Sequence, residues 1–126
     1  MQIKRLDHVN VVTDNLSKMI AWYGDVLGLR SGPRPDFPFG GAWLYAGDAA
    51  VVHLVETTES GRSGSEVPLK LEHFAFSAKD AAAFEKILTE RGERFRKSEV
   101  RDFGQIQFHV ADPDGNHIHV DFDLDD

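Results

Sequence analysis

The sequence predicts an α+β protein built from two copies of one module, a strand, a helix and three further strands (βαβββ). The first observation is a repeated segment: His8 and His73 lie in the matching stretches 6–11 and 71–76, 65 residues apart. The second is a repeat near the end of each half, where His53 and His119 lie 66 residues apart. This period exceeds that of solenoid repeats, so two fused modules are expected.

The first module is predicted from hydrophobic periodicity and breaker residues. Apolar residues alternate in its first strand and then recur at helical spacing from Leu16 to Leu27. Asp14 offers an N-cap for this helix, and Gly28 offers a left-handed C-cap. The expected elements are a strand over 5–12, this helix, a loop rich in Pro and Gly over 32–41, and strands over 42–46 and 50–56.

The second module repeats this order. Asp80 is expected to cap a helix that Gly92 ends, and the turn over 112–116 contains the Pro and Gly of a tight reversal. The expected strands cover 70–77, 94–99, 104–111 and 117–123. We therefore expect a single domain over 1–126, with module 1 at about 1–58, a polar linker at about 59–69 and module 2 at about 70–126.

Composition excludes several function classes. The chain has 126 residues, a formal net charge of −7 and no cysteine. The negative charge disfavours nucleic acid and anionic membranes as partners, and the lack of cysteine excludes disulfides and thiolate chemistry. No apolar run has the length of a membrane span or a signal peptide, so a cytoplasmic protein is the expectation.

Strand alternation places the repeated histidines away from the helix-facing core. Val52 and Leu54 point to one face of their strand and His53 to the other. In the last strand, Ile118 and Val120 point to the core and His119 to the opposite face. If the two modules pair, four imidazoles would line one cleft, and converging imidazoles indicate a metal.

These motifs resemble the vicinal oxygen chelate superfamily, which contains glyoxalases, bleomycin-resistance proteins and extradiol dioxygenases. The resemblance covers nearly the whole chain and is carried by the segments 6–9, 22–29, 72–76 and 112–116. It implies paired βαβββ modules in a cupped, mixed and mostly antiparallel sheet, a cleft for a divalent cation, and a homodimer.

The resemblance also implies a metal site. His8 and His73 fall at the family's ligand positions in the two first strands, whereas His53 and His119 stand where metal-dependent relatives have Glu. We expect these four histidines to bind one divalent transition metal such as Zn, Fe, Ni, Co or Mn, because imidazole suits Mg and Ca poorly.

The function expected from this set is a metal-dependent enzyme of glyoxalase or lyase type. Its partner would be a small molecule that chelates the metal through two adjacent oxygens. His53 or His119 would act as the catalytic base, because imidazole titrates near neutral pH. If only three histidines bind, a ring-cleaving dioxygenase of the extradiol type is the alternative. A metal-free protein that binds a small molecule, like the antibiotic-sequestering relatives, is the third reading.

Other residues receive smaller roles. Trp43 and Phe39 are expected to bind substrate, with core or dimer packing as the equal alternative for Trp43. His109 and His117 are expected to be structural or surface residues, since neither has a counterpart in the other repeat. Asp121 lies on the face of His119 and is the expected supporting carboxylate, whereas strand alternation turns Glu72 away from His73.

Overall fold

The computed structural model describes residues 1–58 and 70–125 of the chain. It divides into two units, Met1–Leu69 and Lys70–Asp126, and each unit contains a strand, a helix and three strands. The elements of the first unit are β1 (Val9–Thr13), α1 (Leu16–Asp25), β2 (Arg30–Gly32), β3 (Gly41–Ala46) and β4 (Ala49–Glu56). Those of the second are β5 (Phe74–Ser77), α2 (Ala81–Arg91), β6 (Arg96–Val100), the 3₁₀ turn η1 (Arg101–Phe103), β7 (Gln105–Ala111) and β8 (His117–Asp123). The predicted α+β class and the duplicated βαβββ order are confirmed.

Each unit forms one four-stranded mixed sheet. The strand order is β1-β4-β3-β2 in the first unit and β5-β8-β7-β6 in the second. In both sheets the first strand runs parallel to the last, and the remaining pairs are antiparallel. Among the described residues, β1 and β5 are thus edge strands, and each is hydrogen-bonded to the strand that carries His53 or His119.

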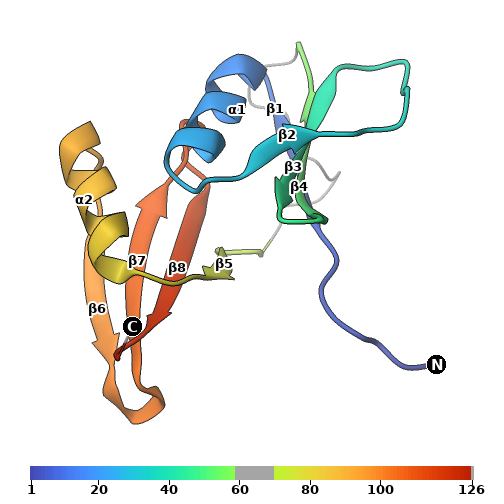
Figure 1. The fold of residues 1–126 in the computed structure, drawn as a ribbon. Coiled ribbons are helices and arrows are strands. Elements are labelled where there is room, and N and C mark those ends of the chain that lie inside the picture. The colour runs from blue at the N-terminus through green and yellow to red at the C-terminus, as the bar shows by residue number, and fades with distance from the viewer. Residues whose placement is uncertain (59–69, 126) are drawn as a thin grey trace. The chain divides into compact units, whose positions relative to one another are not determined.

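One face of each sheet packs against the helix of its own unit. In the first unit, α1 buries Met19 and Tyr23 completely and contacts β2, β3 and β4. In the second, Figure 1 shows β6, β7 and β8 side by side, in orange to red. The α2 ring of Phe84 lies 5.3 Å from Phe108 and 5.7 Å from Phe122. This apolar contact defines the helix-facing side of the second sheet.

The helix ends follow local side-chain chemistry. Asp80, at φ 69°, accepts a hydrogen bond from the Ala83 backbone N–H at 3.1 Å, and Gly92 closes α2 in the left-handed conformation, as the sequence predicts. The N-cap of α1 is Asn15 rather than the expected Asp14. Its backbone N–H donates to Thr13 Oγ1 at 2.9 Å, but its own side chain makes no capping hydrogen bond, so the side-chain cap expected from the sequence is not formed at Asn15.

The first strand of each unit is shorter than the sequence predicts. β1 begins at Val9 rather than at residue 5, and β5 begins at Phe74 rather than at residue 70. The ladder of β5 starts opposite Ile118, because β8 begins only after the 112–116 turn. His8 and His73 therefore lie one residue before their strands. The predicted βαβββ order requires a third strand after α1, for which no range was predicted; it is the three-residue β2.

Register places His53 and His119 on the face opposite the helix in their own sheets. His53 alternates with Val52 and Leu54, which are 0% and 1% exposed. His119 alternates with the buried Ile118 and Val120. The predicted side-chain phase is thus confirmed for both strands. Most of the expected linker falls on residues 59–69, outside the described part of the chain. Within the described ranges, no helix is both long and apolar enough to cross a membrane.

Candidate metal centre

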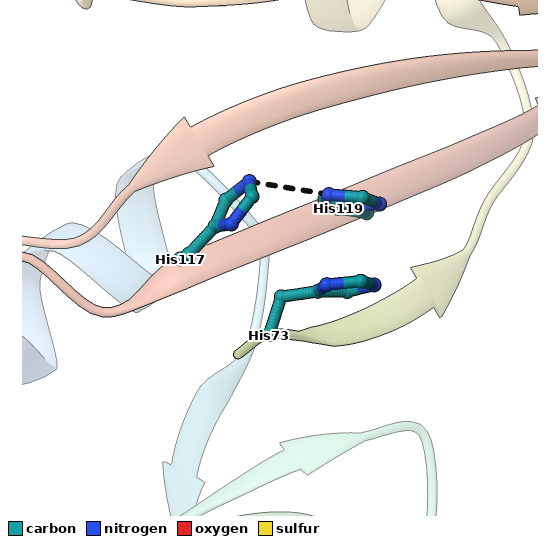
Figure 2. A group of neighbouring side chains, drawn as sticks. All are labelled: His73, His117 and His119. Atoms are coloured by element: carbon teal, nitrogen blue, oxygen red, sulfur yellow. Dashed lines mark hydrogen bonds between the residues drawn. The ribbon is translucent and has the colours of Figure 1, made fainter. Parts of the chain in front are cut away.

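Three histidines of the second unit form a cluster suited to a metal ion. His73, His117 and His119 each offer one ring nitrogen, and these atoms lie within 4.8 Å of one another. Figure 2 shows the imidazole of His73 lying flat against that of His119, with the His117 ring directed toward His119. The His73 and His119 ring centroids are 3.7 Å apart and the planes differ by 12°. Two residues of β8 and one just before β5 thus meet on the polar face of one sheet.

Glu72 sets the tautomers of two of these rings. Its carboxylate accepts a hydrogen bond from Nδ1 of His73 and another from Nδ1 of His117, the latter at 2.7 Å. These two hydrogen bonds lower the pKa of Glu72, which keeps it ionised and able only to accept. The ring proton of each neutral histidine is therefore on Nδ1. The Nε2 lone pairs of His73 and His117 are left available to a cation, in the arrangement that carboxylates impose on metal-bound histidines.

His119 forms a hydrogen bond with His117. The two Nε2 atoms lie 3.1 Å apart, and because His117 Nε2 carries a lone pair, His119 donates. Burial lowers the pKa of His119, and the neighbouring histidines lower it further. Neutral imidazole is therefore the main form at neutral pH, which is the form that binds metals. A cation bound by both nitrogens would replace the proton of this hydrogen bond.

The donor set fits a divalent transition metal. Imidazole nitrogens bind Zn²⁺ at about 2.0–2.1 Å, which places ligand nitrogens roughly 3 Å apart. The Nε2 atoms of His117 and His119 have this spacing, at 3.1 Å, and all three candidate ligand nitrogens lie within 4.8 Å of one another. In addition, Asp121 Oδ1, two residues beyond His119 on the same face, is buried and has no hydrogen-bond partner among the described residues. A buried unpaired carboxylate oxygen is costly, and a nearby cation would compensate it.

The first unit contains a matching pair of histidines. The rings of His8 and His53 stack at 3.8 Å with planes 10° apart, and Asp7 Oδ2 accepts from His8 Nδ1 at 2.7 Å. Burial lowers the pKa of His53, and His8 lowers it further. His53 Nε2 donates to the Ala50 carbonyl at 3.1 Å, so in this rotamer its lone pair is on Nδ1. Asp7, His8 and His53 thus reproduce the arrangement of Glu72, His73 and His119.

Aromatic rings extend the histidine stack of the first unit. Trp43, the cross-strand neighbour of His53, stacks on it at 4.0 Å, and Phe37 lies 6.4 Å beyond. Trp43, His8 and His53 line a hollow of about 440 Å³. Phe39 stacks on Phe37 and is 45% exposed, but it does not line this hollow. The two predicted substrate-binding residues therefore lie in one aromatic cluster, and only Trp43 faces the hollow.

The structure corrects the expectation for Glu72 and adds His117 to the candidate ligands. Glu72 was expected to point away from His73, but strand alternation does not apply here because β5 begins only at Phe74. His117 was expected to be structural, but it contributes a nitrogen to the cluster. The i, i+2 spacing of His117 and His119 on a strand was the signal that could have identified it. The set of four histidines joins residues of both units and stays a prediction.

Comparisons with known proteins agree with this fold. The family model of the Glyoxalase/Bleomycin resistance protein/Dioxygenase superfamily matches residues 5–120. The chain therefore belongs to this superfamily. No curated protein matches the sequence.

Solved structures similar to the chain cover almost all of it. A Bacillus anthracis protein assigned to the glyoxalase family has a TM-score of 0.76 and 26% identity, with 98% of each chain covered. A glyoxylase/bleomycin resistance protein/dioxygenase domain from Frankia sp. EAN1pec has a TM-score of 0.78 and 18% identity, with 97% of this chain and 93% of that chain covered. A lactoylglutathione lyase from Agrobacterium tumefaciens has a TM-score of 0.72 and 20% identity, with 97% and 96% covered. At these identities the last two likenesses concern the fold.

Proposed function

We propose that the chain is a metal-dependent enzyme of glyoxalase or lyase type that acts on a small substrate with two adjacent oxygens. The observation that carries the proposal is the cluster of His73, His117 and His119, in which three ring nitrogens lie within 4.8 Å of one another and Glu72 accepts hydrogen bonds from two of the rings. A divalent transition metal bound there would polarise the substrate oxygens as a Lewis acid. Membership of the superfamily supports this reading.

The residues of the chain supply the remaining functions. Glu72 holds the imidazole rings of His73 and His117 in one orientation, so little reorganisation accompanies substrate binding. His119 and His53 are the proposed proton acceptors. Burial lowers the pKa of both imidazoles, which favours the neutral basic form at physiological pH.

The proposed reaction predicts proton exchange at carbon. Metal-loaded protein is mixed in deuterated water with hemithioacetals of 2-oxoaldehydes and with 2-hydroxycarbonyl compounds, and the carbon-bound proton signals are followed by NMR. We expect loss of a signal that requires both metal and protein. His119→Ala should slow this exchange, whereas an exposed replacement such as Glu90→Gln should not. Stoichiometric metal with no exchange on any of these compounds would contradict the lyase assignment.

A ring-cleaving dioxygenase is the second candidate, because a centre with three histidines leaves room for a bidentate catecholate and dioxygen. The measurement is oxygen uptake with catechols after loading with Fe(II). Uptake that stops in His73→Ala would favour this reaction over the lyase. If purified protein instead contains no metal and takes up none, the chain is a binding protein whose hollow is lined by Trp43.

The tautomer role of Glu72 gives a separate prediction. Glu72→Gln should weaken metal binding by roughly 10–100-fold, because the amide cannot accept from both Nδ1 atoms as an ionised carboxylate does. The measurement is competition for Zn²⁺ against a chelating dye. Glu90→Gln, which changes an exposed carboxylate paired with Lys86 on α2, is the matched control and should bind as wild type does. Equal affinity of the two variants would show that Glu72 has no orienting role.

A further inference from the structure

Two arginines at or just before the start of β6, Arg94 and Arg96, have no carboxylate partner among the described residues. Other cations nearby are paired: Lys97 Nζ lies 3.0 Å from Glu85, and Arg101 Nε lies 3.1 Å from Glu99. In the part of the chain that the structure describes, neither Arg94 nor Arg96 forms an ion pair. The protein has a net charge of −7, but these two guanidinium groups without ion-pair partners make the surface around them locally positive.

Both arginines line one hollow. It has a volume of about 610 Å³ and is lined on the strand side by Arg94, Arg96, His109 and His117. The carboxylate of Glu93, which also borders it, is held by Arg91 at 3.4 Å and so is already compensated. We refer to this space as the β6–β7 hollow.

His109 holds Arg96 in position. Arg96 Nη2 donates to His109 Nδ1 at 3.2 Å, so the proton of the neutral ring is on Nε2, which donates to Ser98 Oγ at 3.2 Å. This chain of hydrogen bonds uses one of the five guanidinium N–H donors. The other donors have no acceptor among the described residues. A planar guanidinium with free donors and a fixed orientation suits bidentate binding of an oxyanion.

The hollow adjoins the candidate metal centre. His109 is the cross-strand partner of His119, with ring centroids 4.0 Å apart, and His117 belongs both to the hollow and to the cluster. Strands lie about 4.8 Å apart, so β6 is roughly 10 Å from β8. A substrate of four or five carbons spans roughly 4–5 Å of that distance. The side chains of Arg96 and of the histidines would reach over the remainder, with the substrate oxygens at the histidines and its far end at Arg96.

We propose that the β6–β7 hollow binds an oxyanion, a carboxylate or phosphate, at the end of the substrate remote from the two metal-binding oxygens. The anion site itself requires no metal. Its assignment to the substrate rests on the proposed function. The hollow would thereby select substrates that carry both vicinal oxygens and a terminal negative charge.

The anion site is tested first on metal-free, full-length protein at constant ionic strength. Inorganic phosphate is titrated and followed by calorimetry or by NMR shifts. Wild-type protein should bind it, and Arg96→Gln should weaken binding about tenfold or more, because hydrogen bonds to charged groups are lost. Arg101→Gln removes an equal charge outside the hollow and should leave binding unchanged. Equal weakening in both variants, or no binding to wild type, would overturn the site.

The substrate assignment is tested on metal-loaded protein with two probes. 2-Oxoglutarate and 2-oxopentanoate share the same adjacent oxygens, but only the first has a distal carboxylate. Wild-type protein should prefer 2-oxoglutarate by about tenfold, and Arg96→Gln should abolish the preference while keeping its metal. Equal binding of the probes by wild type would contradict the assignment. Failure to load metal would refute the proposed function alone, because the phosphate titration still decides the anion site.

Circular dichroism of each variant confirms that the sheet is intact, and Arg96→Lys adds an independent check. Lysine keeps the charge but not the planar fork, so phosphate binding should fall between that of wild type and Arg96→Gln. Binding by Arg96→Lys equal to that of Arg96→Gln would also support a geometric requirement. Binding equal to wild type would mean that charge alone suffices and would contradict bidentate recognition.

Discussion

His73→Ala is expected to lower the affinity for Zn²⁺ or Ni²⁺ on the order of 100-fold or more, since loss of supporting contacts alone costs up to that much. The imidazole of His73 is stacked at 3.7 Å on His119, and its Nδ1 is held by Glu72. Removing it deletes one ligand nitrogen and leaves His117 and His119 as a pair. Because the His73 side chain is 37% exposed, the replacement should leave the fold intact.

The measurement is metal competition with a chelating dye, followed by elemental analysis of protein purified without added metal. His109→Ala is the matched control, because His109 is a histidine of the same unit that lies outside the cluster, with its ring 4.0 Å from that of His119. It should retain affinity within a few-fold of wild type. A His73→Ala protein that keeps full affinity would refute the cluster. His8→Ala tests the four-histidine prediction separately, and that prediction requires a matching loss of affinity.

The duplication allowed part of the site to be predicted from sequence. The stacked pairs His8–His53 and His73–His119 occur at the repeated positions, and each pair lies on one sheet face. Period-two alternation was enough for His53 and His119 because both lie inside their strands, at positions paired with a residue on each neighbouring strand. Alternation gave the wrong side-chain direction for Glu72, because Glu72 lies before β5 and is not part of its pleated backbone.

His117 could not be predicted by repeat symmetry. Its counterpart in the first module is Val51, which lies at the irregular register between β3 and β4, where Tyr45 pairs with Ala50. The two units therefore differ at this position, and the first has a pair of histidines where the second has three. The position of His109 differs as well, since its counterpart beside His53 is Trp43. The polar face of the first sheet carries Trp43 beside His53, whereas that of the second carries His109 beside His119.

The fold was predictable where local chemistry decides it. Asp80 caps the start of α2 because its carboxylate can accept from a free backbone N–H. Gly92 caps the end because glycine adopts positive φ at low cost. Strand lengths were not predictable, because they depend on where the partner strand begins. β5 begins only at Phe74 for that reason, although the apolar pattern extends back to Leu71, which is 67% exposed.

Phe108→Ala is expected to lower the free energy of unfolding by about 3–5 kcal/mol. Phe108 is fully buried, and its ring lies 5.3 Å from Phe84, 5.6 Å from Phe122 and 5.9 Å from Phe95. Truncation would remove these contacts and leave a cavity between α2 and the sheet. Urea unfolding checks the change, with Phe103→Ala as control. Phe103 is 79% exposed, so its replacement should cost less than about 0.5 kcal/mol.

Phe108→Ala should lower the free energy of unfolding without lowering the affinity for the metal. Phe108 and His109 are consecutive in β7 and point to opposite faces, so the cavity forms on the side away from the histidine cluster. The folded variant should keep wild-type affinity within a few-fold. Metal at 100 times its dissociation constant should then restore about 2.7 kcal/mol to Phe108→Ala, because ligand that binds only the native state stabilises it. The same metal concentration should restore far less to His73→Ala. Equal recovery in both variants would mean that the ion binds elsewhere in the chain.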